Sequence, residues 1–257
     1  MEDLDRATVE DVKAWFAANY GASNAVLVLA GDIDVATARE KAARYFGGVR
    51  QGEPISRPAL WTPPMTDIRR DVVYENIPVA VLTRTWPLST AASRDNTLLQ
   101  LAARSLAGGK GTPLHDALVE DMDLASSVSA SVNEGQLAGA FSLSVELKPG
   151  IEPEAAEAAI DQVLTDFYEK GPSVERLETV ASATDLSLLR MLEDSAAIGA
   201  WLAEGETTRG DPTYFLKQRD WIQSPSRDEI RALTARTLSR PYYELVQRPA
   251  PKPARAP

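Results

Sequence analysis

The residues best suited to chemistry lie on a short stretch around the one histidine of the sequence. His115 is followed by Asp116 and Glu120, so one imidazole has two carboxylates close to it along the chain. An imidazole beside a carboxylate suits general acid–base catalysis. A serine nucleophile would also need an elbow such as Gly-x-Ser-x-Gly, which the sequence lacks. We therefore interpret His115 as a packing or surface histidine.

The histidine count also bears on a zinc site. A catalytic zinc is commonly held by two histidines about one helical turn apart, with a glutamate that activates the bound water. Two imidazole ligands cannot come from one histidine, so the sequence excludes such a motif in this chain. Glu120, Asp121 and Asp123 lack the Asp-x-Asp-x-Asp-Gly spacing of a calcium loop. We interpret these three carboxylates as a solvated helix end.

The string Gly108-Gly-Lys-Gly-Thr112 invites comparison with a phosphate-binding loop. A P-loop has four residues between its first glycine and Gly-Lys-Ser/Thr, and it follows a strand. Here the spacing differs, and the preceding segment, Ser93–Ala107, has the three- and four-residue apolar spacing of a helix. Glycines commonly end helices because they adopt positive φ. The string predicts a helix stop followed by a turn.

The elements around this stretch follow from the same patterns. Pro113 suits the first turn of a short helix capped by Thr112, with Leu114, Leu118 and Met122 pointing inward. Two runs of alternating polarity follow and predict a β-hairpin, Leu124–Glu134 and Leu137–Lys148.

The flanking chain predicts further helices and strands and a boundary. Four prolines in the polar run 51–67 predict a linker, and prolines also dominate the tail 249–257. We divide the chain into a helix–strand–helix unit (1–50), the linker (51–67), a main domain (68–248) and the tail (249–257). The predicted helices are Val9–Tyr20, Val35–Phe46, Glu152–Gly171, a long helix from Ser173 to about Gly205 that bends at Gly199, Thr213–Ile222 and Ser226–Leu238. The predicted strands are Ala25–Ala30, Asp71–Thr85 and Tyr242–Gln247.

One internal repeat is visible. The segment from Ser226 to Pro249 aligns without gaps on the segment from Thr8 to Gly31, at an offset of 218 residues. Ile230 falls on Val12, and Leu233 falls on Trp15. Two capped helices that each precede a strand are a common arrangement, so both chance and true duplication remain open.

Composition limits the classes of function. The 257 residues carry 27 basic and 37 acidic side chains, a formal net charge of −10, and no basic patch suited to nucleic acid. There is no cysteine, which excludes disulfides and thiol chemistry. No stretch approaches the length of about 20 apolar residues that a membrane span needs. The acidic start lacks the features of a signal peptide, and we expect the chain to be a piece of a longer protein.

The order of these parts resembles the non-catalytic second domain of the pitrilysin/insulinase (M16) zinc peptidases. That domain has a helix ending in a Leu-Gly-Gly-Gly-like turn, a Ser-Arg-Leu-Tyr-like helix start, a Leu-Arg-Glu-x-x-x-Leu-Ala-Tyr-x-Val segment and a hairpin with Gly-x-Phe. The matching residues here are Leu106, Gly108, Gly109, Thr112, Leu114, Leu118, Glu120, Leu124, Ala125, Val128, Gly139 and Phe141.

The resemblance implies an α+β fold in which a mainly antiparallel sheet carries helices on one face. This is the two-layer sandwich of the M16 and mitochondrial processing peptidases. By resemblance, residues 1–50 are either the end of a zinc-bearing domain or the lead-in to the second domain. The family places an arginine and a tyrosine on the substrate chamber, and these positions are Val119 and Ser126 here. Either this half never carried the pair or the alignment is off by one residue.

The function implied by the resemblance is that of a non-catalytic domain. It would help to enclose an unfolded peptide against a separate domain or subunit that carries His-x-x-Glu-His and the zinc. The chain alone would be inactive and would hold no cofactor, although its parent protein would be a zinc metallopeptidase. Bacterial relatives are often periplasmic. The alternative is a structural or assembly scaffold with the same fold and no role in proteolysis.

Overall fold

The computed structural model describes residues 6–54, 62, 65–88, 93–135 and 137–251. The chain divides into two compact units. The first combines Met1–Ala59 with Ser187–Lys217, and the second combines Leu60–Leu186 with Gln218–Pro257. Each unit is thus built from two stretches that are far apart in the sequence.

The second unit is built on a five-stranded sheet with the strand order β1-β5-β2-β4-β3. The strands are β1 Arg69–Glu75, β2 Val81–Leu88, β3 Ala125–Glu134, β4 Gly139–Leu147 and β5 Tyr243–Pro249. β5 runs parallel to β1 and antiparallel to β2, and the remaining pairs of the sheet are antiparallel. The predicted α+β class and the mainly antiparallel sheet are confirmed.

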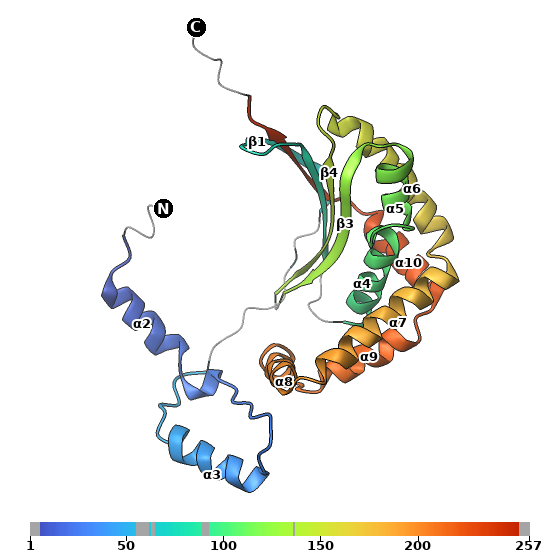
Figure 1. Ribbon diagram of the computed structural model, residues 1–257. Helices are drawn as coiled ribbons and strands as arrows, with labels where there is room; N and C mark the ends of the chain where they lie inside the picture. Colours follow the sequence, from blue (N-terminus) through green and yellow to red (C-terminus); the bar gives the residue numbers. More distant parts are fainter. Residues whose placement is uncertain (1–5, 55–61, 63–64, 89–92, 136, 252–257) are drawn as a thin grey trace. The chain divides into compact units, whose positions relative to one another are not determined.

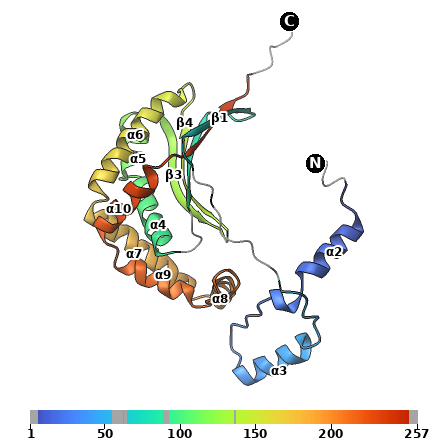
Figure 2. The same ribbon diagram turned by 180° about the vertical axis from the view of Figure 1, so that it is seen from behind.

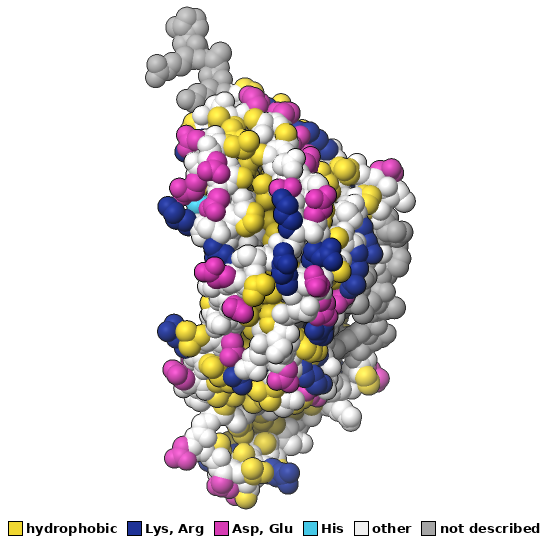
Figure 3. All heavy atoms as spheres, turned by 90° about the vertical axis from the view of Figure 1, so that its right-hand side faces the viewer, with side chains coloured by type: hydrophobic (Ala, Val, Ile, Leu, Met, Phe, Trp, Pro, Cys, Tyr) yellow, Lys and Arg dark blue, Asp and Glu magenta, His cyan; other side chains and the backbone are white. Residues whose placement is uncertain are grey.

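The helices of this unit pack on one face of the sheet and form a second layer (Figures 1 and 2). They are α4 Arg94–Ala107, α5 Pro113–His115, the π-helix η2 Asp116–Asp121, α6 Pro153–Lys170, α10 Arg227–Leu238 and most of α7 Val174–Met191 and α9 Tyr214–Gln223. The outer surface of the helical layer shows acidic and basic side chains interspersed with hydrophobic ones (Figure 3). The predicted arrangement of helices on one face is therefore correct.

Alternation along the strands decides which face meets the helices. In β2 the side chains of Leu82, Trp86 and Leu88 are buried, whereas the residues between them, Arg84 excepted, are only partly buried. β4 repeats the pattern, with large apolar side chains at every second position from Phe141 to Leu147. Because successive side chains of a strand point to opposite faces, one face is apolar and the other is polar.

The helix α4 supplies much of the core. Ser93 caps its N-terminus by accepting a hydrogen bond from the backbone N–H of Asn96 at 3.2 Å. Ten of its 14 residues are buried, including Leu98, Leu101 and Leu106. Burying a leucine side chain contributes about 1.5–3 kcal/mol, so this helix binds tightly to the sheet.

An ion-pair cluster that the sequence patterns did not indicate lies between the sheet and α6, with Arg84 and Glu244 buried and Asp161 largely exposed. Arg84 Nε donates to Glu244 Oε2 at 2.8 Å, and Arg84 Nη1 donates to Asp161 Oδ1. The guanidinium lies 4.8 Å from the ring centroid of Tyr242. Burial disfavours the charged form, but the hydrogen bonds to Glu244 and Asp161 outweigh it, so the pKa of Arg84 is raised. The cluster joins β2, β5 and α6.

The first unit differs from the second in that two of its helices contain no buried residue. It holds α2 Val9–Asn19, the short 3-10 helix η1 Ala22–Asn24, α3 Val35–Phe46 and α8 Ser195–Arg209. Thr8 and Asp11 form the predicted capping box of α2. Neither α2 nor α3 contains a buried residue. Both helices therefore keep their apolar side chains exposed.

Ala25–Ala30, predicted to be a strand, pairs with no other strand in the described part of the chain. Its backbone is extended, as its unbroken apolar composition suggests, but a strand also needs a hydrogen-bonding neighbour. The five described strands all belong to the second unit. The prediction of a strand was wrong, because an apolar run indicates an extended conformation but does not say which strand will pair with it.

Two further elements are interrupted where the sequence suggests continuity. The predicted strand Asp71–Thr85 is two strands, β1 and β2, with Pro78 in the connection between them. The predicted helix from Ser173 to about Gly205 is also two, α7 and α8. Asp194 caps α8 by accepting from the N–H of Ala196 at 2.8 Å. The break therefore lies at an aspartate cap and not at Gly199, because a side-chain cap satisfies the free N–H groups of a new helix.

Parts of the predicted linker and tail lie outside the described residues, namely 55–61, 63–64 and 252–257. Among the residues that are described, the structure contains no helix with the length and apolar character needed to cross a bilayer.

The ion-pair cluster generates a stability prediction. Arg84→Ala should lower the free energy of unfolding by about 3 kcal/mol, because buried Glu244 would lose its hydrogen-bonded cation and keep only Arg70, whose Nε lies 3.6 Å away. Arg84→Met combined with Glu244→Leu should recover most of this loss, since the buried charges disappear together. Urea unfolding followed by circular dichroism measures both effects.

The matched control is Arg104→Ala, which removes an exposed arginine that donates to Thr184. We expect a change within about 0.5 kcal/mol. A loss of the same size at Arg84 and Arg104 would contradict the structural role assigned to the cluster.

Candidate functional site

Three irregularities of the backbone follow one another between α5 and β3. Residues Asp116–Asp121 form a π-helix. Asp123 has φ of 56°, the one positive φ outside glycine in the described chain. A bulge then interrupts the pairing of β3 with β4 between Ala125 and Ser127. Irregularities of these kinds are common at functional sites because they change the direction of side chains.

Backbone hydrogen bonds fix this segment to the hairpin. The N–H of Leu124 donates to the carbonyl of Leu118 at 2.9 Å, and the N–H of Lys148 donates to the carbonyl of Leu124 at 3.0 Å. The ammonium group of Lys148 also pairs with the Asp123 carboxylate. Met122 was predicted to point inward and is instead 55% exposed. It lies in the turn after the π-helix, where the helical spacing used for the prediction no longer holds.

Val119 and Ser126 lie in different surroundings within this segment. Val119 is in the π-helix, partly buried and packed against the core. Ser126 is the extra residue of the bulge and is exposed, and its Oγ donates to the carbonyl of Glu146 at 3.2 Å. Neither side chain supplies a cation or a phenol.

The open face of the sheet carries hydroxyl groups in two rows. Thr83, Ser144 and Ser129 are aligned across β2, β4 and β3. Thr85, Ser142 and Ser131 are aligned in the same way one step along. The Oγ1 of Thr83 and the Oγ of Ser144 are 3.5 Å apart. We refer to these six residues as the hydroxyl rows.

The hydroxyl rows form a small, uncharged and polar surface. Each hydroxyl can both donate and accept a hydrogen bond, so the surface suits a polar backbone without selecting a charge. The sequence analysis did not identify these residues. The signal was present in the alternating strings Val128-Ser-Ala-Ser-Val132 and Phe141-Ser-Leu-Ser-Val145, which place serine at every second position.

β3 forms one edge of the sheet and has β4 on one side only. From Ala125 to Asn133 it contains neither a charged residue nor a proline. Protein sheets usually protect an edge with such residues, because unpaired N–H and C=O groups accept an additional strand. The opposite edge, β1, begins Arg69-Arg-Asp71 and is charged. The β3 edge is thus the more open of the two to an extended chain.

The described residues do not fit a zinc ion. The side chain of His115 is 18% exposed, and its Nδ1 lies 3.7 Å from Asp116 Oδ1. No group of three or more potential ligands comes together in the described part of the chain. The single histidine of the sequence also rules out a His-x-x-Glu-His site.

The glycine string is a structural turn. Gly109 and Gly111 have φ of 104° and 79°. The N–H of Gly111 donates to Asp116 Oδ1 at 2.8 Å, and Arg176 donates to the Gly111 carbonyl. Thr112 occupies the N-cap position of α5, but its hydroxyl donates to the carbonyl of Gly109 at 2.6 Å instead of capping the helix. Protein groups therefore occupy positions that a phosphate would need.

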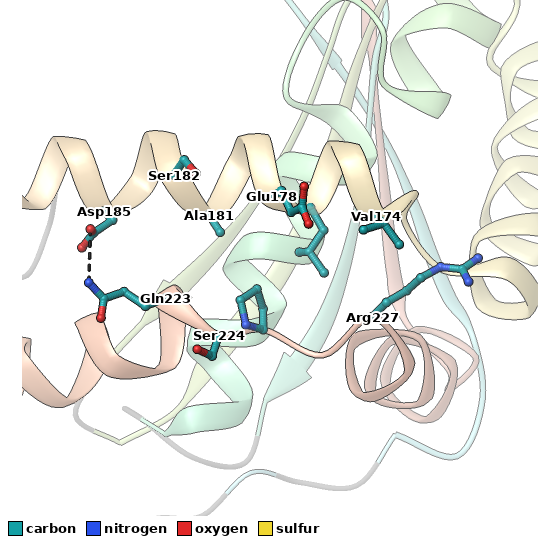
Figure 4. Close-up of a pocket in the computed structure, with 10 residues that line it drawn as sticks. Val174, Glu178, Ala181, Ser182, Asp185, Gln223, Ser224 and Arg227 are labelled. Carbon is teal, nitrogen blue, oxygen red and sulfur yellow. Dashed lines mark hydrogen bonds between the residues drawn. The ribbon is translucent and has the colours of Figure 1, made fainter.

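A hollow of about 470 Å³ lies between α7 and the chain that follows α9 (Figure 4). Asp185 bonds to Gln223 at its edge, and Arg219 Nε donates to Asp185 at 2.7 Å. The hydrogen bond from Arg219 holds the pKa of Asp185 below its usual value. Arg227 donates to the carbonyls of Pro172 and Lys170. Asp185 and Arg227 thus have protein partners and fix the helices to one another.

Comparison with known proteins places these features in context. The family model of the peptidase M16 inactive domain matches residues 6–184. The zinc protease PqqE of Helicobacter pylori is 22% identical over 238 residues, which cover 90% of this chain. The chain spans 53% of the length of that protein, about half.

Two of the solved structures that share the fold illustrate the extent of the likeness. A protease from Helicobacter pylori superposes with a TM-score of 0.87 at 17% identity, over 97% of this chain and 61% of that chain. The periplasmic protease PqqL from Escherichia coli has a TM-score of 0.66 at 18% identity, over 85% of this chain and 24% of that chain. The likeness therefore covers nearly the whole chain but only part of each relative.

Asp123 provides a test of the backbone geometry of the candidate site. A residue with a Cβ is strained at positive φ, whereas glycine is not. We expect Asp123→Ala to be less stable than Asp123→Gly by about 1 kcal/mol, measured by urea unfolding. The exposed ion pair with Lys148 is lost in both variants, so it cancels in the comparison. Equal stability of the two variants would show that the positive φ is not maintained in solution.

Proposed function

The chain belongs to the peptidase M16 family, as an inactive domain, and from this membership we propose that it is the non-catalytic half of a chamber that encloses peptides for proteolysis. In related proteins, inactive M16 domains pair with catalytic domains. The zinc and the His-x-x-Glu-His motif belong to that separate domain. The chain itself would form one side of the chamber, which we call the wall.

The observation that carries the proposal is the open face of the sheet. Helices cover one face, and the other presents the hydroxyl rows and the uncharged β3 edge. A peptide in extended conformation can pair with a free strand edge through its backbone and place its side chains over a polar surface. The hydroxyl rows themselves carry no charge, which supports binding there that depends little on the peptide sequence.

Val119 and Ser126 are the proposed chamber positions. By the resemblance they align with the arginine and tyrosine of the family, and the irregular segment that holds them joins the helical layer to the β3 edge. Valine and a hydrogen-bonded serine cannot supply the cation and phenol of the pair. This wall would therefore bind peptide through backbone and hydroxyl groups alone.

The cellular compartment is proposed from the relatives. A periplasmic M16 protease is among the structures that share the fold, and we propose the periplasm as the compartment.

The first test concerns catalysis. The chain alone should contain no zinc by mass spectrometry and should leave a quenched fluorescent peptide uncleaved, because its single histidine cannot build the site. Addition of its zinc-bearing partner domain should produce cleavage that a chelator abolishes. Zinc at one equivalent with cleavage by the chain alone would contradict the proposal. A stable complex without any cleavage would favour the scaffold.

The second test concerns the wall. In the complex with the zinc-bearing domain, Ser144→Trp should lower kcat/KM for an unstructured peptide by about tenfold, which corresponds to 1.4 kcal/mol, because the indole fills the space over the hydroxyl rows. Ser129→Trp, in the same row, should act alike.

The control for both is Ser182→Trp, which places the same side chain on the exposed surface of α7. We expect it to leave kcat/KM unchanged. Thermal unfolding of each variant shows whether a loss of activity reflects a loss of fold. Equal activity of all three variants would separate peptide binding from this face of the sheet.

A further inference from the structure

β1 is an edge strand with one unpaired side. It has β5 on one side, and no strand of the described residues lies on the other (Figure 1). The N–H of Arg69 donates to the carbonyl of Tyr242 at 3.1 Å, and the carbonyl of Glu75 accepts from the N–H of Ala250 at 2.7 Å, so both residues bond toward β5. Backbone groups of successive residues point to opposite sides of a strand. Every second residue from Arg70 to Tyr74 therefore directs its N–H and C=O outward.

The same alternate positions carry exposed apolar side chains. Ile68, Val72 and Tyr74 are 57%, 45% and 63% exposed. Val72 lies opposite Val246 of β5, which is fully buried and is paired in turn with Leu82 on the face that the helices cover. The helical layer therefore ends before it reaches β1 and leaves these side chains in contact with solvent. An apolar surface beside unpaired backbone groups suits the addition of another strand.

The charges of β1 decide which strand it can accept. Charged residues on an edge commonly prevent pairing with other chains. Here their order is complementary to itself, because the strand begins with Arg69 and Arg70 and ends with Glu75. When a second copy of β1 runs antiparallel and the pairing is centred on Val72, Arg69 lies opposite Glu75 of the second copy. Two-fold symmetry makes this contact occur twice.

The neighbouring registers are unfavourable for two reasons. A slip of one residue would set the outward backbone groups of one copy against residues of the other copy that already bond to β5. A slip of two residues would place Asp71 opposite either Asp71 or Glu75 of the second copy, and like charges directly opposite each other destabilise a sheet. The register centred on Val72 avoids both problems. Exposed charge pairs contribute little free energy, so they select the register, whereas the backbone ladder and the apolar side chains supply the affinity.

We propose that two copies of this chain associate through β1, antiparallel and with Val72 on the two-fold axis, so that their sheets become one continuous sheet. Val72 lies opposite Val72 of the second copy, and Arg70 lies opposite Tyr74. Each of these facing pairs exchanges two backbone hydrogen bonds. Facing residues of paired strands point to the same face, so both open faces lie on one side of the joined sheet. The β3 edges stay at its two ends, which keeps this association separate from the proposed binding of peptide.

A single introduced cysteine tests the register, since the chain contains none of its own. The Cα atoms of a hydrogen-bonded antiparallel pair lie about 5.5 Å apart, which is within the range of a disulfide. Val72→Cys in the full chain should therefore form a disulfide-linked dimer under mild oxidation, seen by non-reducing gel electrophoresis. Tyr74→Cys is the matched control, because its two copies would lie about 13 Å apart along the strands and should remain unlinked.

Charge reversal tests the pairing of Arg69 with Glu75. Analytical ultracentrifugation of the full chain should show a dimer whose population rises with concentration. Arg69→Glu should raise the dissociation constant of this dimer about tenfold, because a like-charge pair then occurs twice. The double variant Arg69→Glu/Glu75→Arg should restore the original constant, since the complementary order is kept in reverse. Arg240→Glu, at an exposed arginine outside β1, should leave the constant unchanged.

Two results would overturn the inference. One is sedimentation of the unaltered chain as a monomer up to high micromolar concentration. The other is a dimer in which the two cysteine variants cross-link to the same extent, or in which the double charge variant fails to restore what Arg69→Glu removes, because the copies would then meet at another surface. Neither result bears on the proposed function, which the cleavage assay tests separately.

Discussion

The position of β5 inside the sheet is the constraint on which the second unit depends. The last described strand along the chain lies between the first two, so the sheet cannot be completed until residues near both ends of the unit meet. The contacts at this junction are specific. Trp86 Nε1 donates to the carbonyl of Leu238 at 3.0 Å, and Arg84 bonds to Glu244 across 160 residues of sequence. Because a buried charge without its partner is costly, this pairing also selects the register of β2 against β5.

A sheet with helices on one face leaves the other face available. In this unit the covered face is filled mainly by leucines, phenylalanine and tryptophan, whereas serine and threonine line the part of the open face formed by β2, β4 and β3. On the helical side, charged side chains such as Asp185 and Arg227 already have hydrogen-bond partners within the protein. The open side shows the hydroxyl rows beside the β3 edge, which carries no charge from Ala125 to Asn133. The proposed function requires such an uncovered polar face, because a non-catalytic domain would bind the peptide while a separate domain cleaves it.

The first unit illustrates the opposite situation. Its helices are well capped and their apolar residues recur at helical spacing, yet none of the residues of α2 or α3 is buried. The helix caps are therefore formed, whereas the apolar side chains of these helices are not buried. Capping contributes about 1 kcal/mol and cannot replace the burial of several large side chains. A similar pattern of a capped helix followed by an extended segment is buried in α10 and β5. The exposure of α2 and α3 therefore reflects a lack of packing neighbours and not a low helix propensity.

Local sequence patterns were enough to predict most helices and strands and to make one firm exclusion. Alternation gave the hairpin, helical spacing and glycines gave α4 and its end, and the histidine count removed the zinc motif. Each of these depends on residues close together in the chain or on composition alone. The assembled fold was needed to identify the ion pair of Arg84, the hydroxyl rows and the unpaired state of Ala25–Ala30. These depend on which distant strands become neighbours, and the pattern within a single strand carries no information about that choice.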